Sequence, residues 1–484
     1  MICSGCRFSG HDGTGGRFWG ICPMTDFSAL LVADRGQPAH LLHILRKDGL
    51  DSWLGEQPER VRTAVATSLF KGKPGDFALL PGDKPDSFAA VIGVPEEAGP
   101  WDLAGAVGRL PEGSYRLADG EPGLGALGWL LAHHRFDRYL RAPDPIPQRI
   151  LLTSEPAKIA ETVRLAEAVA LVRDLVDTPA GDLGPAELAA AAEAVANEVG
   201  ATFRVTQGDA LAEDYPLITA VGRAATHARG PRLVEIEWGN PAHPRIAIVG
   251  KGVCFDSGGL DIKPSSAMLT MKKDMGGAAH ALALARLVMT AQLPVRLHLL
   301  IPAVENAVSG DAFRPGDILS SRKGLHVEIG NTDAEGRLIL GDALARACEA
   351  EPALLIDFAT LTGAARVALG PDLPALYAND DTLAQDLAEA GTAVGDPIWR
   401  LPLWQPYREM LKSTVADINN AGAGGFAGSI TAALFLERFV APAVPWAHFD
   451  TFAWRPSGKP GRPKGGDALG LRAAWEMLRR RYAS

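Results

Sequence analysis

The segment NTDAEGRL, residues 331 to 338, brings two acidic side chains and an arginine within five positions of one another. The preceding LHVEIG alternates like a β-strand, and the following LILGDALARACEA repeats like a helix. Asp333, Glu335 and Arg337 are therefore expected at a turn from strand to helix. Thr332 followed by Glu335 has the form of a capping box, and acids suit the positive end of a helix dipole. Taken alone, the segment fits helix capping as well as metal binding.

A second group of charged residues lies upstream, in VGKGVCFDSGGLDIKPSSAMLTMKKDMGGAA, residues 249 to 279. Glycine pairs follow Asp256 and Asp274 closely, and glycines let a backbone turn sharply around a site. Several acids on loops at one edge of a sheet repel one another unless a counter-charge is present. The alternative is a charged surface loop with lysine–aspartate pairs. The charged residues of this segment are Lys251, Asp256, Asp261, Lys263, Lys272, Lys273 and Asp274.

The charges in the two segments match a pair of divalent cations. Four carboxylates, those of Asp256, Asp274, Asp333 and Glu335, balance two divalent ions. Oxygen ligands with one nitrogen donor suit zinc, manganese or magnesium. The nearest histidines lie just outside the motifs, and we expect both to have structural positions, His280 on a helix face and His326 on a strand.

The second half of the chain must position these residues. Its candidate strands are RLVEIEW, RIAIVG, VRLHLLIPA, LLIDFA and PWAHFD, and helices are expected near 276–291, 336–350 and 429–440. This alternation predicts an α/β fold with a mainly parallel, largely buried sheet and helices on both faces. Ligands of such sheets lie at the carboxyl ends of the strands. NTDAEGRL, GKGVCFDSGG and ATLTGA are all expected there.

The first half reads as a smaller α/β domain over residues 24–148. Apolar runs such as FALLPG and FAAVIGV alternate with helix-like stretches such as LGALGWLLAHHRF. The proline-rich RAPDPIPQ then interrupts the pattern. We expect residues 149–180 to form a linker with a long helix from Glu155 to Val176, and residues 181–484 to form the larger domain, beginning with the helix PAELAAAAEAVANEV.

Bulk composition agrees with a globular protein of two or three domains, since 484 residues are too many for one core. The net charge of 48 − 57 = −9 does not favour nucleic acid or an anionic membrane as the main partner. No apolar run approaches the roughly 20 residues that span a bilayer. We therefore expect a protein without a membrane partner.

The five cysteines do not form a disulfide framework. Cys254 and Cys348 lie in apolar segments and are expected to be buried and free, which indicates a reducing, cytoplasmic setting. The other three lie in residues 1–23, which we expect to be a disordered or untranslated extension before Met24. A zinc site is the alternative for that segment, with Cys3, Cys6, His11 and Cys22 as its ligands.

At this point the sequence resembles the leucine aminopeptidase (cytosol aminopeptidase) family of two-metal exopeptidases. NTDAEGRL is the signature of that family, and GKGVCFDSGGLDIKP with MKKDMGGAA matches its other hallmark. RDLVDTPAGDLGP, ATLTGAARVALG and ADINNAGAGGFAGSITAALFL are similar as well. The resemblance covers about residues 155–484 and is weak before them. Ser257 stands where the family often has threonine.

The resemblance implies a three-layer α/β/α catalytic domain with a mainly parallel mixed sheet, and a role for each matching residue. Asp256 and Glu335 would each be shared between two metal ions. Lys263 and Arg337 would be catalytic residues that do not bind the metals. Met271, Thr360, Leu361 and Gly363 would contact the substrate or line its side-chain pocket. The metal ligands would be Lys251, Asp256, Asp274, Asp333 and Glu335.

The same resemblance implies hydrolysis of the N-terminal residue from peptides and dipeptides that have a free N-terminus. Two divalent ions per subunit, manganese or zinc, would hold a bridging water and the substrate amine. Lys263 would stabilise the developing oxyanion, and Arg337 would hold a bicarbonate ion that acts as general base. A homohexamer in the cytoplasm is expected from the family.

Three other interpretations compete with this enzyme. One is a DNA-binding or structural role, as in some bacterial relatives, which the net charge and the full ligand set disfavour. Another is a paralogue that has lost catalysis, but no ligand is missing. The last is a different metallohydrolase on a similar sheet, which would have to match NTDAEGRL by coincidence.

Overall fold

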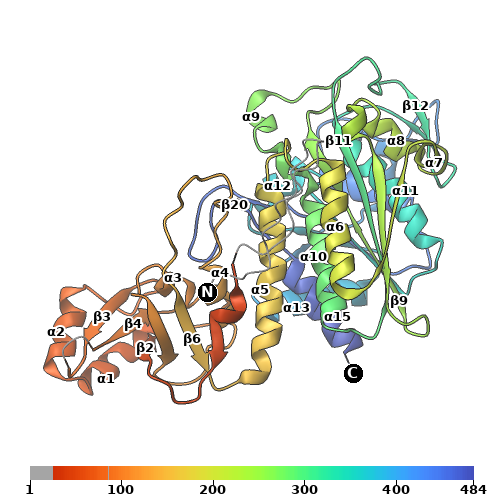
Figure 1. Ribbon diagram of the computed structural model, residues 1–484. Helices are drawn as coiled ribbons and strands as arrows, with labels where there is room; N and C mark the ends of the chain where they lie inside the picture. The colour runs from red at the N-terminus through yellow and green to blue at the C-terminus, as the bar shows by residue number, and fades with distance from the viewer. Residues whose placement is uncertain (1–24, 85–86, 484) are drawn as a thin grey trace.

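The computed structural model describes residues 25–84 and 87–483. It divides into a smaller N-terminal lobe and a larger C-terminal lobe, with the long helix α5 (Pro156–Asp177) between them (Figure 1). The two α/β lobes were predicted from the sequence. The expectations for residues 1–23 lie outside the described residues.

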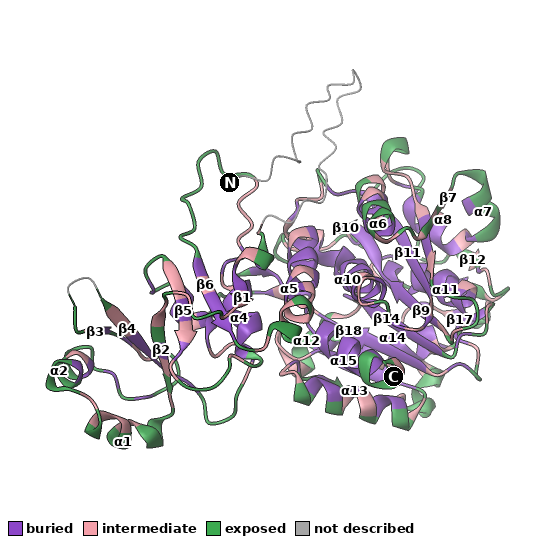
Figure 2. Ribbon diagram, turned by 60° about the horizontal axis from the view of Figure 1, so that its bottom comes forward, coloured by how far each residue is buried: buried purple, intermediate pink, exposed green. Residues whose placement is uncertain are grey.

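The N-terminal lobe is built on a six-stranded sheet in the order β1-β6-β5-β2-β4-β3. Neighbouring strands run parallel except β3 and β4, which pair antiparallel. Its helices α1 and α2 are largely exposed at the far end of the lobe (Figure 2). The elements are β1 (Leu31–Ala33), β2 (His40–Leu45), α1 (Leu50–Gly55), α2 (Glu59–Thr67), β3 (Phe77–Pro81), β4 (Phe88–Gly93), α3 (Ala104–Val107), β5 (Gly113–Leu117), α4 (Gly125–Leu131) and β6 (Arg149–Thr153).

Strand β6 corrects one part of the expected linker. Residues 149–153 form a central strand of the N-terminal sheet, paired with β1 and β5, so this sheet extends to Thr153. The linker proper is α5, which begins at Pro156 as its first-turn proline favours. It packs against α4 of the small lobe and α10 (Gly276–Thr290) of the large lobe. The helix therefore fixes one lobe against the other.

The C-terminal lobe contains a nine-stranded mixed sheet in the order β16-β15-β18-β14-β9-β11-β8-β7, with β10 paired to β11. The central strands β18, β14, β9 and β11 are mutually parallel, and β8 and β7 run antiparallel to their neighbours. Strand β15 pairs antiparallel with β18 and parallel with β16. The strands are β7 (Thr202–Gln207), β8 (Arg232–Trp238), β9 (Arg245–Gly250), β10 (Gly252–Asp256), β11 (Arg296–Asn306), β14 (Leu354–Ala359), β15 (Ala375–Ala378), β16 (Trp399–Arg400) and β18 (Trp446–Asp450).

Helices cover both faces of this sheet, as the sequence predicted, and the side chains of β9 alternate between two cores. Ile246 and Ile248 enter the core under α5, α6, α10 and α15, whereas Ala247 and Val249 enter the core under α8, α11 and α14. A strand buried on both faces must be apolar throughout, and RIAIVG is. The helices are α6 (Pro185–Val199), α7 (Asp209–Asp214), α8 (Pro216–Gly222), α9 (Ser265–Met268), α11 (Glu335–Cys348), α12 (Gly363–Leu369), α13 (Asp381–Ala393), α14 (Gly428–Glu437) and α15 (Leu471–Tyr482).

The strand before NTDAEGRL lies outside the main sheet, which corrects the expected position of that segment. It is β13 (His326–Glu328), and it forms a small three-stranded sheet with β12 (Ile318–Ser320) and β17 (Ile418–Asn419). Another small pair joins β19 (Trp454–Arg455) to β20 (Gly465–Gly466). The short 3₁₀ segments are η1 (Phe27–Ala29), η2 (Lys47–Gly49), η3 (His227–Arg229), η4 (Met271–Met275) and η5 (Gln405–Leu411).

Within the described ranges, no helix combines the length and apolar character needed to cross a bilayer. Cys254 and Cys348 are buried and free, as predicted.

Candidate metal centre and substrate cavity

The site lies where the parallel strands β9, β14 and β18 end. Lys251 directly follows β9, Thr360 directly follows β14, and Asp450 is the last residue of β18. All three line a cavity of about 330 Å³. The carboxyl ends of parallel strands were the predicted place for a ligand, and two of the three expected loops open here.

The loop after β9 is shorter than predicted. Residues 252–256 of GKGVCFDSGG form strand β10, which pairs with β11 and carries Asp256 at its end. Lys251 therefore stands at the junction of two strands. Gly258, just beyond β10, has φ +87°, a conformation that L side chains rarely adopt. This turn carries the chain on toward Lys263.

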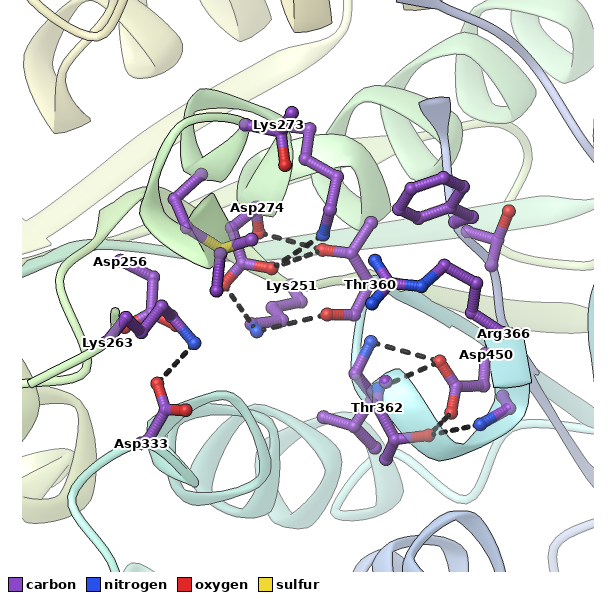
Figure 3. Close-up of a pocket in the computed structure, with 18 of the residues that line it drawn as sticks. Lys251, Asp256, Lys263, Lys273, Asp274, Asp333, Thr360, Thr362, Arg366 and Asp450 are labelled. Atoms are coloured by element: carbon purple, nitrogen blue, oxygen red, sulfur yellow. Dashed lines mark hydrogen bonds and ion pairs between the residues drawn. The ribbon is translucent and has the colours of Figure 1, made fainter. Parts of the chain in front are cut away.

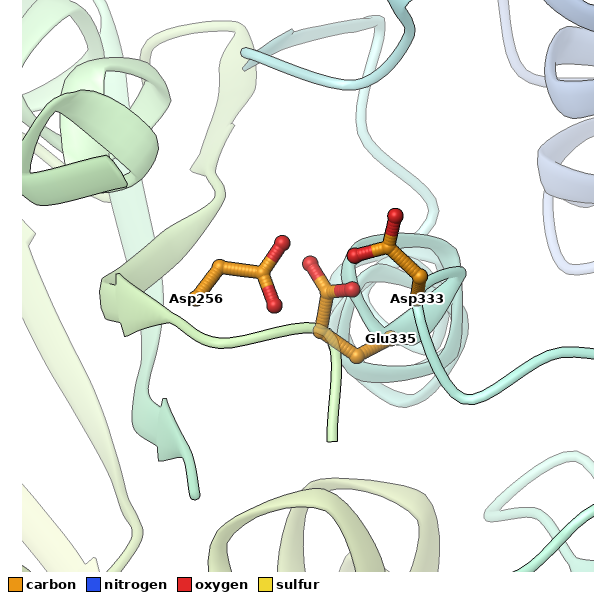
Figure 4. A group of neighbouring side chains, drawn as sticks. All are labelled: Asp256, Asp333 and Glu335. Carbon is orange, nitrogen blue, oxygen red and sulfur yellow. The ribbon is translucent and has the colours of Figure 1, made fainter. Parts of the chain in front are cut away.

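Three carboxylates converge at one point of the cavity. Asp256, Asp333 and Glu335 each offer an oxygen, and these oxygens lie within 4.8 Å of one another. Figure 4 shows the three carboxylates turned toward a common centre, although Asp256 ends β10, Asp333 lies in the turn before α11 and Glu335 begins α11. The Oε2 atom of Glu335 is buried and has no hydrogen-bond partner among the described residues. Buried polar atoms are rarely left unpaired, so this donor set fits a divalent cation.

Lys251 joins Asp274 to this group. Its Nζ atom lies 2.6 Å from Asp274 Oδ2 and 2.9 Å from Glu335 Oε1, and it donates to the carbonyl oxygen of Thr360 at 3.3 Å. The approach depends on Gly336, because a Cβ at that position would collide with the Lys251 side chain. The glycine of NTDAEGRL thus makes room for the lysine.

Lys263 pairs with the other two acids. Its Nζ atom lies 2.9 Å from Asp256 Oδ2 and forms an ion pair with Asp333. In Figure 3, Lys263 and Asp333 lie on one side of the cavity, and Thr360, Arg366 and Asp450 lie on the other. The predicted residues Lys251, Asp256, Lys263, Met271, Asp274, Asp333, Glu335, Thr360, Leu361 and Gly363 all line this cavity.

Burial and mutual repulsion shift the acids toward their neutral forms. Burial and the nearby charge of Asp274 raise the pKa of Asp256 to about 6. Burial and the charge of Asp256 raise the pKa of Glu335 to about 7. Burial also raises the pKa of Asp333. Carboxylates held this close together need a cation between them to stay ionised.

The lysines supply positive charge in the protein alone. Burial favours the neutral amine of Lys251, but the charges of Asp274 and Glu335 outweigh it and raise its pKa above the ordinary value. Burial likewise opposes ionisation of Asp274, yet Lys251 and Lys273 outweigh it and lower the pKa of that acid. Lys251 therefore holds the position of a cation between two carboxylates.

The predicted capping box is wrong. Ala334 occupies the N-cap position of α11 and makes no side-chain capping hydrogen bond. Glu335 is the first helical residue. Thr332 instead ties down the turn after β10. Its hydroxyl donates to the carbonyl oxygen of Gly258 at 2.7 Å and accepts from the backbone N–H of Asp261 at 2.8 Å. The hydroxyl serves a long-range contact, so local capping is not what shapes this helix start.

Arg337 follows Glu335 by two positions on α11 and is not among the cavity-lining residues within the described chain. It is buried, and its Nη1 atom donates to the carbonyl oxygen of Asn420 at 2.6 Å. Its Nε atom has no hydrogen-bond partner in the described part of the chain. Burial lowers the pKa of the guanidinium to about 10.

His280 accepts from the backbone N–H of Leu469, away from the acids, as its expected helical position implied.

Sequence reasoning missed Asn306, Asp450 and one contact of the predicted residue Thr360, all of which organise the site. Asn306 donates to Asp256 Oδ1 at 2.9 Å, and the Thr360 hydroxyl donates to Asp274 Oδ1 at 2.8 Å. Asp450 accepts from the backbone N–H groups of Leu361 and Thr362, each at 3.1 Å, and from the Thr362 hydroxyl at 2.6 Å. Asp450 ends the predicted strand PWAHFD, so the strand-end rule pointed to it. No local sequence pattern indicated the contact of Thr360 with Asp274.

Comparison with known protein families covers both lobes. The model described as cytosol aminopeptidase family, catalytic domain, matches residues 170–474. The model described as M17 aminopeptidase, N-terminal domain, matches residues 41–151. The resemblance therefore includes much of the small lobe, which the sequence motifs alone matched weakly.

Curated relatives carry the name of the same family. A probable cytosol aminopeptidase of Roseiflexus castenholzii is 41% identical over 413 residues, covering 82% of this chain and 80% of that protein. Another of Syntrophotalea carbinolica is 42% identical over 368 residues, covering 72% of this chain and 73% of that protein.

Solved structures give the same result. The cytosol aminopeptidase of Coxiella burnetii superposes with a TM-score of 0.89 at 46% identity, covering 93% of this chain and 99% of that chain. The bottromycin maturation enzyme BotP, in complex with Mn, superposes with a TM-score of 0.82 at 34% identity, covering 92% of this chain and 100% of that chain. The catalytic-domain match, the identities and the shared fold establish that this chain belongs to the cytosol aminopeptidase family and is a metallo-exopeptidase.

Proposed function

We propose that this aminopeptidase removes the N-terminal residue from peptides and dipeptides with the help of two divalent ions. One observation carries the proposal: five side chains from three separate segments of the chain meet in a single cavity. We assign Asp256 and Glu335 as ligands shared between the ions. The complete ligand set is Lys251, Asp256, Asp274, Asp333 and Glu335.

The ions would supply a bridging water of lowered pKa and a positive charge that attracts the free amine of the substrate. The carboxylate-rich donor set suits manganese or zinc, and the Mn complex of BotP supports manganese. Lys251 would bind as a neutral amine, so its proton must leave when an ion enters. Asn306 and Thr360 hold Asp256 and Asp274 in fixed orientations, as residues that support metal ligands do.

Lys263 is proposed to stabilise negative charge that develops on the scissile carbonyl oxygen. Its ammonium lies at the edge of the carboxylate group, paired with Asp256 and Asp333. These charges outweigh the effect of burial and raise its pKa above the ordinary value, which keeps the group protonated. A preorganised cation in a partly buried cavity is an effective stabiliser of an oxyanion.

Arg337 is proposed to hold a bicarbonate ion, which would accept a proton from the attacking water. Its Nε atom, which has no hydrogen-bond partner among the described residues, supports this role, since a buried guanidinium favours a bidentate anion. The bond to Asn420 fixes the plane of the guanidinium. The anion would have to reach Arg337 from the cavity that Glu335 borders.

The side chain of the substrate's first residue is proposed to enter between η4 and the start of α12. Met271 and Leu361 give this pocket apolar walls, and Gly363 leaves space at the α12 start. The Thr360 and Leu361 backbone is proposed to contact the substrate directly. Asp450 fixes that backbone segment by accepting from two of its N–H groups.

We propose a homohexamer in the cytoplasm as the working form. Large apolar side chains on the surface, including Val367 at 84% and Phe426 at 85% exposure, support association of this chain. The names of the curated relatives support the location. Light scattering on the purified protein would test the subunit number.

The activity is tested with matched blocked and unblocked substrates. The manganese-loaded enzyme should release p-nitroaniline from leucine p-nitroanilide and should leave N-acetyl-leucine p-nitroanilide intact, because the amine is needed for binding. Glu335→Gln should lose this activity and its bound metal together. Equal cleavage of the blocked substrate would contradict an aminopeptidase mechanism of this kind.

A further inference from the structure

The cavity contains a cation that the proposed mechanism does not use. Arg366 lies on α12 one turn beyond Gly363, and its Nη2 atom would lie 3.9 Å from a Cβ at Gly363. It lines the cavity together with Lys273 and Phe452. Its guanidinium therefore stands beside the pocket that we assign to the first side chain of the substrate.

The other cations of the cavity are close to carboxylates. Lys251 and Lys263 each contact two acids, and Lys273 lies 3.5 Å from Asp274. Arg366 differs, because among the described residues it forms no ion pair with a carboxylate. A guanidinium presents a planar set of donors that matches a carboxylate, so the one that lacks such a partner is a ready anion site.

Phe452 brings Arg366 and Lys273 to the same place. The Arg366 Cζ atom lies 4.8 Å from the centre of its ring, and the Lys273 Nζ atom lies 5.6 Å from it. Both distances are in the range of cation–π attraction. In Figure 3 both side chains extend on the Thr360 side of the cavity, opposite Lys263 and Asp333. The ring thus brings two cations to this wall of the cavity, where the neighbouring Asp450 is already engaged by residues 361 and 362.

From this geometry we infer that the side-chain pocket accepts an acidic first residue, aspartate or glutamate, whose carboxylate is bound by Arg366 with Lys273 beside it. The inference rests on the proposed aminopeptidase function and names its substrate class. The apolar part of such a side chain would contact Met271 and the Phe452 ring. Arg366 thus determines specificity and takes no part in the bond-breaking step.

The test compares the p-nitroanilides of glutamate, leucine and lysine with the manganese-loaded enzyme. We expect the wild type to cleave the glutamate substrate readily and the lysine substrate poorly. Arg366→Met should lower the ratio of kcat/KM for glutamate over leucine by about 10- to 100-fold, the range for a lost charged hydrogen bond. Arg366→Lys should restore part of that ratio. Arg314→Met, an exposed arginine outside the cavity, is the control and should keep the ratio.

The outcomes separate this inference from the proposed function. Cleavage of leucine p-nitroanilide without cleavage of the glutamate substrate overturns the acidic subsite alone. No cleavage of any unblocked substrate overturns the aminopeptidase proposal itself. If Arg366→Met weakens leucylglycine but leaves both anilides unaffected, the arginine binds the terminal carboxylate of a dipeptide, and the inference is wrong.

Discussion

The Lys251 Nζ atom lies 2.6 Å from Asp274 Oδ2, so a lysine ammonium occupies the space between two of the proposed metal ligands. The same atom lies 2.9 Å from Glu335 Oε1. In the protein alone this ammonium neutralises the acids. A divalent ion and the Lys251 proton therefore compete for the same carboxylates.

Metal binding should release the Lys251 proton. The charges of Asp274 and Glu335 hold its pKa above the ordinary value without metal, so the group is protonated at neutral pH. The apparent affinity for Mn²⁺ should rise with pH, by about one log unit per pH unit for each proton lost. Calorimetry in buffers of different ionisation enthalpy measures this release. Lys251→Met should release one proton fewer, and Lys272→Met, outside the cavity, should match the wild type. Equal proton release by all three proteins would contradict the ligand assignment.

Arg337→Met should slow catalysis while the metals stay bound. The guanidinium donates to the Asn420 carbonyl, and among the described residues it donates to none of the carboxylates proposed as metal ligands. Loss of a residue that positions a base should lower kcat by about 100-fold, with metal content unchanged. Turnover and elemental analysis on the same sample check this. Parallel loss of metal and activity would show that Arg337 acts structurally.

Asp450→Asn should disturb the substrate-binding segment without removing metal. The carboxylate accepts three hydrogen bonds from residues 361 and 362, and an amide can accept at only one end. We expect kcat/KM for leucine p-nitroanilide to fall about tenfold. Asp381→Asn, an exposed aspartate on α13, is the matched control. An unchanged kcat/KM in Asp450→Asn would mean that the segment holds its shape without this support.

Asp342 should give the fold a measurable pH dependence. It is fully buried, and burial raises its pKa to about 7 despite hydrogen bonds from the backbone of Leu217, Ile218 and Arg322. The folded state therefore binds a proton that the unfolded state has lost above pH of about 4. This group's contribution to the free energy of unfolding falls as pH rises from about 4 to about 7, by at most about 1.4 kcal/mol per pH unit.

Urea unfolding of the wild type and of Asp342→Asn between these pH values tests whether the contribution of Asp342 to the free energy of unfolding falls as pH rises. The variant lacks the titrating group, so the stability advantage of the wild type should narrow as pH rises. Asp381→Asn should keep a constant difference from the wild type. A wild-type advantage that widens with pH would contradict the raised pKa.

The sequence predicted the buried elements best. RLVEIEW, RIAIVG and LLIDFA became β8, β9 and β14 with the predicted bounds, and α6 also matches, because an apolar run or a helical repeat between glycines and prolines is a local signal. Short edge strands carry almost no such signal, because they hold too few residues to show a pattern. Strand β16, for example, has two residues. β13 pairs with β17, far away in sequence, and no local pattern indicates that partner.

The candidate site was predicted residue by residue through resemblance, and the structure brings most of those residues together. What the sequence could not supply was the partner of each side chain. Thr332 was predicted to cap the helix but donates to Gly258, and no sequence pattern indicated that Arg366 contacts the Phe452 ring. Both contacts join segments that only the folded chain makes neighbours.

Metal content measured together with activity tests the central claim most directly. The protein is stripped with a chelator, dialysed, reloaded with Mn²⁺ and analysed for metal and for cleavage of leucine p-nitroanilide. The account predicts two ions per chain in the reloaded enzyme, with activity that is absent after stripping and returns with the metal. A reloaded protein that holds no stoichiometric metal and cleaves no unblocked peptide would contradict it.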